Sequence, residues 1–148
     1  MKVTFQYGLA GYSGKLDGLV FCNNRELGKA YARKYRYPRL TEGNERIGSV
    51  TSALFALKPS KAYQDDMYLY RKRYNALREN SGCPVRSWSA MYLKLMYRMA
   101  KADGSIDLRT LTREELYARK LPCISVKMAV EAGLLPAVYA YTELTHEL

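Results

Sequence analysis

The spacing of hydrophobic and polar positions along the chain changes near residue 40. Before that point, residues 19–22 (LVFC) form a short apolar run, and residues 29–37 (KAYARKYRY) alternate with the two-residue repeat of a β-strand. Glycines at positions 8, 11, 14 and 18 interrupt any helical pattern. We therefore expect a glycine-rich β-hairpin, with residues 23–28 as its connection and Pro38 as the end of the second strand.

After a polar link at 41–45, apolar side chains recur three or four positions apart, which is the spacing of amphipathic helices. The clearest seam contains Tyr63, Met67, Tyr70, Tyr74 and Leu77. The expected helices cover 46–58, 61–80, 88–102, 112–120 and 126–132, and most begin after a serine or threonine suited to the N-cap position. Residues 137–144 fit either a last strand or a helical tail.

These elements predict an α+β fold, in which an N-terminal glycine-rich β-hairpin precedes a bundle of about five short helices. The length of 148 residues fits one domain with a substantial core. Within that single domain, residues 1–40 would form a basic hairpin or arm, and residues 41–148 would form the mainly helical part.

The net charge of +10 is unevenly distributed along the chain. Residues 1–46 carry nine Lys or Arg against four Asp or Glu, and residues 58–101 carry ten against three. Residues 102–148 carry five against seven, so only this last third is slightly acidic. Such an asymmetry favours a polyanionic partner, either nucleic acid or an acidic protein face, although it also serves solubility.

Compartment and membrane signals point to the inside of a cell or particle. The three cysteines, Cys22, Cys83 and Cys123, lie far apart, and their odd number is typical of free thiols in a reducing compartment. The first residues lack the apolar core of a signal peptide, and no apolar run approaches the length of a membrane span. We expect a cytoplasmic or virion protein that is not secreted through a signal peptide.

Motifs for catalysis, cofactors and metals fail on inspection. Residues 8–16 (GLAGYSGKL) lack the first glycine and the hydroxyl of a phosphate-binding loop, and Lys15 replaces the second glycine of a nucleophile elbow. Residues 103–114 resemble a calcium loop, but Leu108 stands where the sharp turn needs glycine. The single histidine, His146, lies in the terminal tail, a poor place for a general base. We expect no enzyme, no cofactor, no metal site and no small-molecule substrate.

Residues 112–137 offer one alternative function, since two short helices joined by a tight turn are similar to the helix-turn-helix of small DNA-binding regulators. The second helix would read DNA, but its only charges are Lys127 and Glu131. Recognition helices are usually richer in Arg, Lys, Asn and Gln. Two helices that simply pack together are the simpler interpretation.

The candidate binding residues lie in the hairpin, where cations and tyrosines are interleaved between positions 25 and 39. They are Arg25, Lys29, Tyr31, Arg33, Lys34, Tyr35, Arg36, Tyr37 and Arg39. Odd positions from 29 would share one face of the strand, with Lys34 and Arg36 on the other. Cations suit phosphates or acidic faces, and tyrosines suit stacked bases or protein interfaces. The alternative is an edge strand charged against aggregation, with its tyrosines packed on the helices.

The N-terminal third also carries a recognisable pattern. Gly8, Gly11, Ser13, Gly14 and Lys15 form G-x-x-G-x-S-G-K, followed by Gly18, Val20, Phe21, Tyr31, Arg33, Pro38 and Thr41 and then an apolar helix. This pattern resembles the opening of a family of small proteins from Bacteroidetes and their phages. Asp17 stands where that family commonly has glycine, and the glutamine usual after the threonine is missing. The resemblance implies no enzymatic activity and transfers no site residue, but it favours a phage-like setting.

Together these observations predict a non-enzymatic structural or binding subunit of a larger, nucleic-acid-containing assembly such as a virion. Its hairpin would contact neighbouring subunits or nucleic acid. The expected partners are other protein subunits, in an oligomer or larger assembly, together with DNA or RNA, and no membrane.

Overall fold

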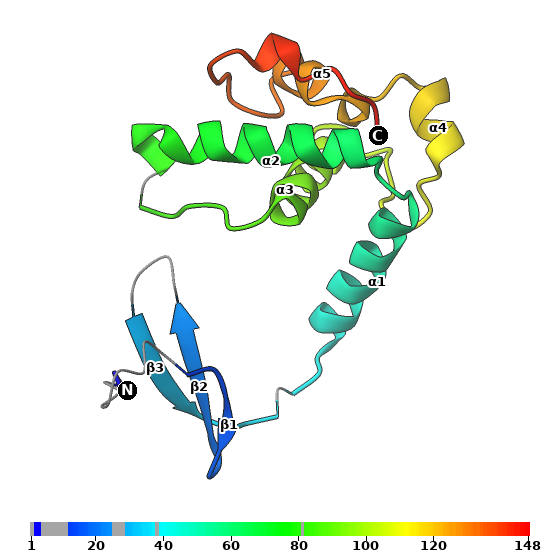
Figure 1. Cartoon of the computed structure of the whole chain (residues 1–148). Coiled ribbons are helices and arrows are strands. Elements are labelled where there is room, and N and C mark those ends of the chain that lie inside the picture. The colour runs from blue at the N-terminus through cyan, green and yellow to red at the C-terminus, as the bar shows by residue number, and fades with distance from the viewer. Residues whose placement is uncertain (1, 4–11, 25–28, 38, 81) are drawn as a thin grey trace. The chain divides into compact units, whose positions relative to one another are not determined.

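The computed structural model describes residues 2–3, 12–24, 29–37, 39–80 and 82–148, and the chain forms two compact units, 1–40 and 41–148 (Figure 1). The first unit holds a three-stranded antiparallel sheet, and the second holds five α-helices. The α+β class predicted from the sequence is confirmed, with the strands before the helices.

The sheet of the first unit has the order β1-β2-β3, with β1 at Gly14–Leu16, β2 at Leu19–Asn24 and β3 at Lys29–Lys34. Asp17 and Gly18, both with positive φ, make the two-residue turn between β1 and β2. Asp-Gly is a favoured pair in such turns because their backbone twist matches that of the flanking strands. On the free edge of β3, Lys2 forms an antiparallel bridge with Tyr31.

The sheet differs from the expected hairpin in two ways. The hairpin of β2 and β3 is present, but β1 adds a third strand to it. The last strand was expected to run to residue 37 and ends at Lys34, whose partner is Leu19, the first residue of β2. Because β2 begins at Leu19, it offers no further residue to pair with the backbone of β3 beyond Lys34. Among the described residues after Lys34, the Tyr35 amide continues the ladder, donating to the Gly18 carbonyl at 2.8 Å.

The helices of the second unit are α1 (Glu42–Ala56), α2 (Lys61–Ala76), α3 (Trp88–Ala102), α4 (Arg113–Ala118) and α5 (Val126–Glu131). Short 3₁₀ turns lie at Arg78–Asn80, Pro122–Ile124 and Tyr141–Glu143. The serines and threonine expected to cap α2 to α5 each accept a hydrogen bond from a main-chain N–H of the first turn. Residues 137–144 are neither a strand nor a continuous helix, since only one 3₁₀ turn forms there.

The expected polar link at 41–45 is wrong, because α1 already begins at Glu42. The hydroxyl of Thr41 caps the helix by accepting from the Asn44 amide, and Glu42 and Glu45 lie in the first turn. Threonine at the N-cap and carboxylates in the first turn both stabilise a helix start. The polar character of this segment therefore marks a helix N-terminus rather than a loop.

The core of the helical unit forms around α2 and α3. The predicted α2 seam is confirmed, with Tyr63, Met67 and Tyr70 fully buried. From α3, Met91, Tyr92 and Leu95 are also fully buried. No helix among the described residues is long and apolar enough to cross a membrane.

Candidate nucleic-acid interface

One face of the N-terminal sheet gathers cations and tyrosines. Side chains of a strand alternate between the two faces, so Lys29, Tyr31 and Arg33 of β3 lie on the same one. The register places Val20 and Cys22 of β2 on that face, opposite Arg33 and Tyr31, and Lys15 of β1 opposite Val20. We call this surface, with Lys2 and Tyr35 at its margins, the basic face: Lys2, Lys15, Val20, Cys22, Lys29, Tyr31, Arg33 and Tyr35.

Tyr31 lies at the centre of the cations. Lys29 and Arg33 flank it two positions away along β3, about 6.6 Å in each direction. Lys2 lies beside it across the free edge of the strand, and Cys22 lies beside it on β2. The Tyr31 side chain remains 44% exposed, so a ring surrounded by three cations is open to solvent.

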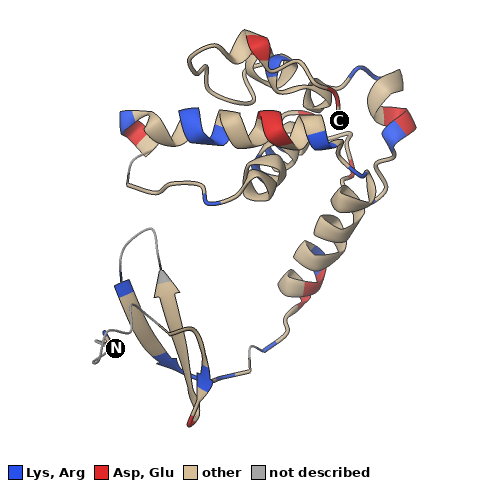
Figure 2. Cartoon of the chain, in the orientation of Figure 1, with Lys and Arg blue, Asp and Glu red and all other residues tan. Residues whose placement is uncertain are grey.

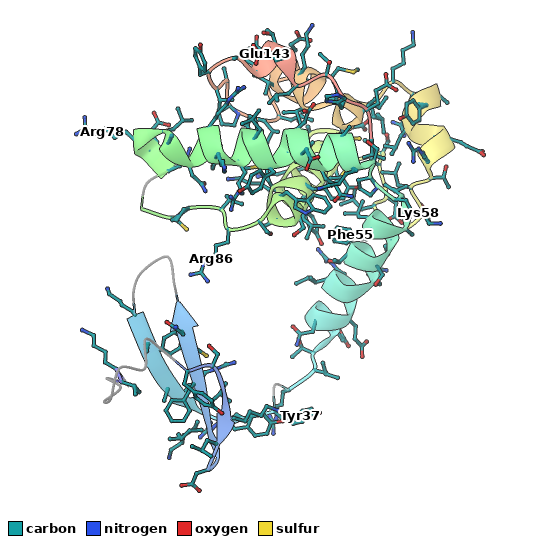
Figure 3. All side chains as sticks on the ribbon, in the orientation of Figure 1. Tyr37, Phe55, Lys58, Arg78, Arg86 and Glu143 are labelled. Carbon is teal, nitrogen blue, oxygen red and sulfur yellow. The ribbon has the colours of Figure 1, made fainter. Side chains whose placement is uncertain are left out.

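Tyr35 repeats this pairing of ring and cation at the end of the sheet. The Lys15 Nζ lies over its ring, 4.2 Å from the centroid, which also shows independently that the two residues share a face. The Tyr35 ring meets Tyr37 edge to face at 6.1 Å, and Tyr37, labelled in Figure 3, is 85% exposed. Lysine and tyrosine thus hold one another in place while Tyr35 stays 43% exposed.

The opposite face of the sheet is mainly apolar. Tyr12 packs edge to face on Phe21 of β2, with ring centroids 5.6 Å apart, and Ala32 of β3 is only 3% exposed. A Cβ at Gly14 would lie 2.6 Å from the Tyr12 hydroxyl, so a larger residue there would displace the Tyr12 ring from its present position. The two faces therefore have different chemistry, and the cations of the basic face do not contribute to an apolar core.

The basic face carries no carboxylate among its described residues. In the described part of this unit the one acidic residue is Asp17, in the β1–β2 turn, and the other charged positions are Lys or Arg (Figure 2). Within the described ranges, no ion pair involves Lys2, Lys15, Lys29 or Arg33. Like charges about 7 Å apart in water repel by roughly 0.6 kcal/mol per pair, and a bound polyanion would remove this cost.

The nine residues predicted from the sequence separate into four groups. Lys29, Tyr31, Arg33 and Tyr35 lie on the basic face, whereas Lys34 lies on the opposite face, as the alternation predicted. Arg36, Tyr37 and Arg39 follow the sheet and belong to no strand. Arg25 lies outside the described residues. The role of all nine in binding stays a prediction.

Sequence reasoning missed the contributions of Lys2 and Lys15 to this face. A signal for Lys15 was present, because K-L-D-G-L-V is an Asp-Gly turn between two apolar-rich segments, and its register places Lys15 opposite Val20. Lys2 had no such signal, since its bridge to Tyr31 joins residues far apart in the sequence.

The helical unit also places cations over aromatic rings, and in one of these clusters two cations share a ring. On α2, the Tyr68 ring has the Arg71 guanidinium 4.9 Å and the Lys72 ammonium 4.7 Å from its centroid. Arg71 also donates to the carbonyl of Arg86, in the segment that precedes α3. This cluster occupies a helix side rather than a sheet and offers one ring only.

The helix-turn-helix alternative receives little support from the geometry. On α5, Val126 and Ala129 are fully buried, and Val130 is nearly so. Lys127 and Glu131 occupy its outer side, 4.0 Å apart as an ion pair. The helix would therefore offer DNA a single cation that already has a carboxylate beside it.

The calcium-like segment at 103–114 is an ion-paired loop. The Asp103 carboxylate accepts a hydrogen bond from the Ser105 amide and pairs with Arg119 at 2.9 Å. Hydrogen bonds from Ser105, reinforced by the Arg119 charge, lower the pKa of Asp103 below its usual value. Among the described residues, no three His, Cys, Asp or Glu side chains are grouped to hold a metal.

A contact that sequence reasoning also missed joins Asp66 to His146. Asp66 is only 7% exposed and accepts from the His146 amide at 3.1 Å, and the His146 Nδ1 lies 3.0 Å from its other oxygen. The tail is not frayed, because Ser60 also donates to the Glu147 carbonyl and the Leu148 amide donates to the Ile124 carbonyl. The separation of 80 residues left no pattern by which to foresee the pair.

No family model matches this chain, and neither a curated protein nor a solved structure matches it.

Proposed function

We propose that this chain is a non-enzymatic binding subunit of a nucleic-acid-containing assembly, such as a virion, and that the basic face of its N-terminal sheet contacts the nucleic acid. The observation that carries this proposal is the composition of that face. Its four charged residues, Lys2, Lys15, Lys29 and Arg33, are all cations, and they surround two exposed tyrosines.

Nucleic acid is the partner that uses both kinds of side chain. Lysine and arginine neutralise phosphates, and the counterions they displace favour binding whatever the sequence. Tyrosine rings stack on bases, which an acidic protein face does not offer. An acidic protein partner would meet the same cations, and tyrosines also serve protein interfaces, so the experiment has to separate the two kinds of partner.

Membership of an assembly is supported by the distribution of exposed apolar side chains along the chain. Leu40, the last residue of the first unit, is 80% exposed, and Ile47 and Tyr139 of the helical unit are 59% and 86% exposed. Exposed large apolar and aromatic side chains are typical of protein contact surfaces. The resemblance of the N-terminal third to small phage-associated proteins favours the same setting.

The test is a binding titration of the whole chain against a fluorescent mixed-sequence oligonucleotide, followed by anisotropy at low salt. The informative variant is Lys15→Glu with Arg33→Glu, which reverses two of the four cations. The matched control is Lys101→Glu with Arg109→Glu, which makes the same change in net charge on exposed positions of the helical unit. Light scattering on the same samples measures the mass of the protein alone and of the complex.

We expect the chain to bind the oligonucleotide, the sheet variant to lose most of that affinity and the control to keep it. Equal losses in both variants would mean that net charge, and not this face, governs binding, and would refute the proposed site. A chain that forms a defined oligomer and ignores nucleic acid would instead make the face a protein-docking surface and would refute the proposed ligand.

A further inference from the structure

The width of the sheet limits which form of nucleic acid it fits. A two-stranded ribbon can enter the major groove of duplex DNA, which is about 12 Å wide. Here the sheet has three strands, and Lys2 and Val3 add a short segment beside Tyr31 and Ala30 on the free edge of β3. Two intervals of about 4.8 Å give about 10 Å between the outer backbones of the three strands, twice the width of a two-stranded ribbon, so the sheet does not enter that groove as such a ribbon does.

The spacing of side chains along β3 suits an extended strand instead. Tyr31, Arg33 and Tyr35 follow one another on the basic face at intervals of about 6.6 Å, so that ring, cation and ring alternate. Lys29 continues the alternation beyond Tyr31, and Lys15 supplies a cation at Tyr35. The two rings are about 13 Å apart, which is more than one nucleotide step, so they suit two bases separated by an intervening nucleotide. Bases of an unpaired strand are free to stack on such rings, whereas in a duplex the bases are already stacked on one another.

The exposure of the two rings supports this arrangement. Tyr31 is 44% and Tyr35 is 43% exposed, and neither ring is enclosed by the apolar face, where Tyr12 packs on Phe21 instead. Tyr31 has no ring partner among the described residues. An exposed ring between cations, on a rigid strand, is the arrangement by which single-strand-binding proteins stack bases while following the backbone.

We infer that the ligand of the basic face is single-stranded nucleic acid, DNA or RNA, with one base stacked on Tyr31, another on Tyr35, and the backbone of the intervening nucleotide on Arg33. This inference rests on the proposed function, since it names the form of nucleic acid that the same face binds. It assigns the tyrosines to the bases and the four cations to the backbone. Sequence preference is expected to be weak, because every base has a face on which to stack.

The experiment compares a mixed-sequence single strand with the same strand annealed to its complement, by anisotropy at one low salt concentration. Tyr31→Leu with Tyr35→Leu removes both rings while leaving every charge in place. Tyr31→Phe with Tyr35→Phe keeps the rings and removes only the hydroxyls. Tyr139→Leu is the control, because that tyrosine is also exposed to solvent but lies in the helical unit.

We expect the unaltered chain to bind the single strand at least about tenfold more tightly than the duplex. The leucine variant should lose about tenfold or more in affinity for the single strand and change little toward the duplex, since stacking is lost and phosphate contacts remain. The phenylalanine variant and the Tyr139→Leu control should bind the single strand as the unaltered chain does.

The outcomes separate the two proposals. Equal affinity for single strand and duplex in the unaltered chain would overturn this inference and leave the proposed nucleic-acid function standing. So would a leucine variant that keeps its single-strand affinity. Failure of the unaltered chain to bind either form would overturn both. Circular dichroism of each variant shows whether the sheet remains folded, and the comparison on the unaltered chain decides the inference even if the leucine variant unfolds.

Discussion

The salt dependence of binding can be worked out from the charges on the basic face. The perturbation is Lys15→Gln with Arg33→Gln, which removes two of its four cations without introducing negative charge. For a single strand, the slope of log affinity against log salt concentration is about −0.7 for each phosphate neutralised. Four contacts therefore give about −2.8, and two contacts give about −1.4.

These slopes correspond to large differences in affinity. Raising salt fourfold, from about 50 to about 200 mM, should weaken the unaltered chain by about 50-fold and the variant by about 7-fold. The assay is an anisotropy titration of a labelled single strand at several salt concentrations. Other cations of the chain would add equally to both slopes, so the difference of about 1.4 is the predicted quantity.

The matched control for this experiment is Lys101→Gln with Arg109→Gln, which lowers the net charge by the same amount from exposed positions of the helical unit. It should leave the slope unchanged. The reasoning is refuted if the slope of the sheet variant equals that of the unaltered chain, because the two side chains would then not meet phosphates. It is also refuted if the control lowers the slope as much as the sheet variant does.

Three further predictions concern the thiols, the buried tyrosines and the buried carboxylate. Iodoacetamide should alkylate the exposed Cys83 with or without a bound oligonucleotide, whereas the oligonucleotide should protect Cys22, which lies beside Tyr31. Burial raises the pKa of Cys123 to about 12, so mass spectrometry should find this thiol unmodified until the protein unfolds. Burial also raises the pKa of three tyrosines above the usual 10.0: Tyr63, Tyr70 and Tyr92. The folded state holds these protons more tightly than the unfolded state, so their contribution to the free energy of unfolding is fully present below pH 10. Above pH 10 that free energy, measured by urea unfolding, should fall by up to about 1.4 kcal/mol per pH unit for each tyrosine. An unchanged free energy of unfolding between pH 10 and 11 would contradict this. Finally, Asp66→Ala should lower the free energy of unfolding by about 1–3 kcal/mol, because it removes the acceptor of the His146 amide. The control Asp65→Ala breaks only a surface pair with Lys61 and should lower it by less than about 1 kcal/mol. Equal losses of stability in thermal unfolding would refute the role of the buried pair.

The sequence by itself determined the features that depend on neighbouring residues. The seam from Tyr63 to Tyr74 could be predicted because residues three and four apart share a helix face wherever that helix packs. The caps at Ser60 and Ser87 could be predicted because a hydroxyl reaches an N–H only three residues away. The same locality placed Lys29, Tyr31 and Arg33 on one face, since alternation along a strand needs no partner.

Only the tertiary structure decided which residues from distant positions join these local patterns. Lys2 reaches Tyr31 by pairing with the free edge of β3, and a strand edge accepts any extended segment, so the local sequence does not specify the partner. His146 reaches Asp66 across 80 residues, because packing of the tail on the helices brings the two together. The candidate site thus combines a strand whose chemistry was visible in the sequence with cations that depend on strand pairing. Pairing contacts between distant residues leave no periodic signal along the chain, which is why the composition of the full basic face could not be foreseen.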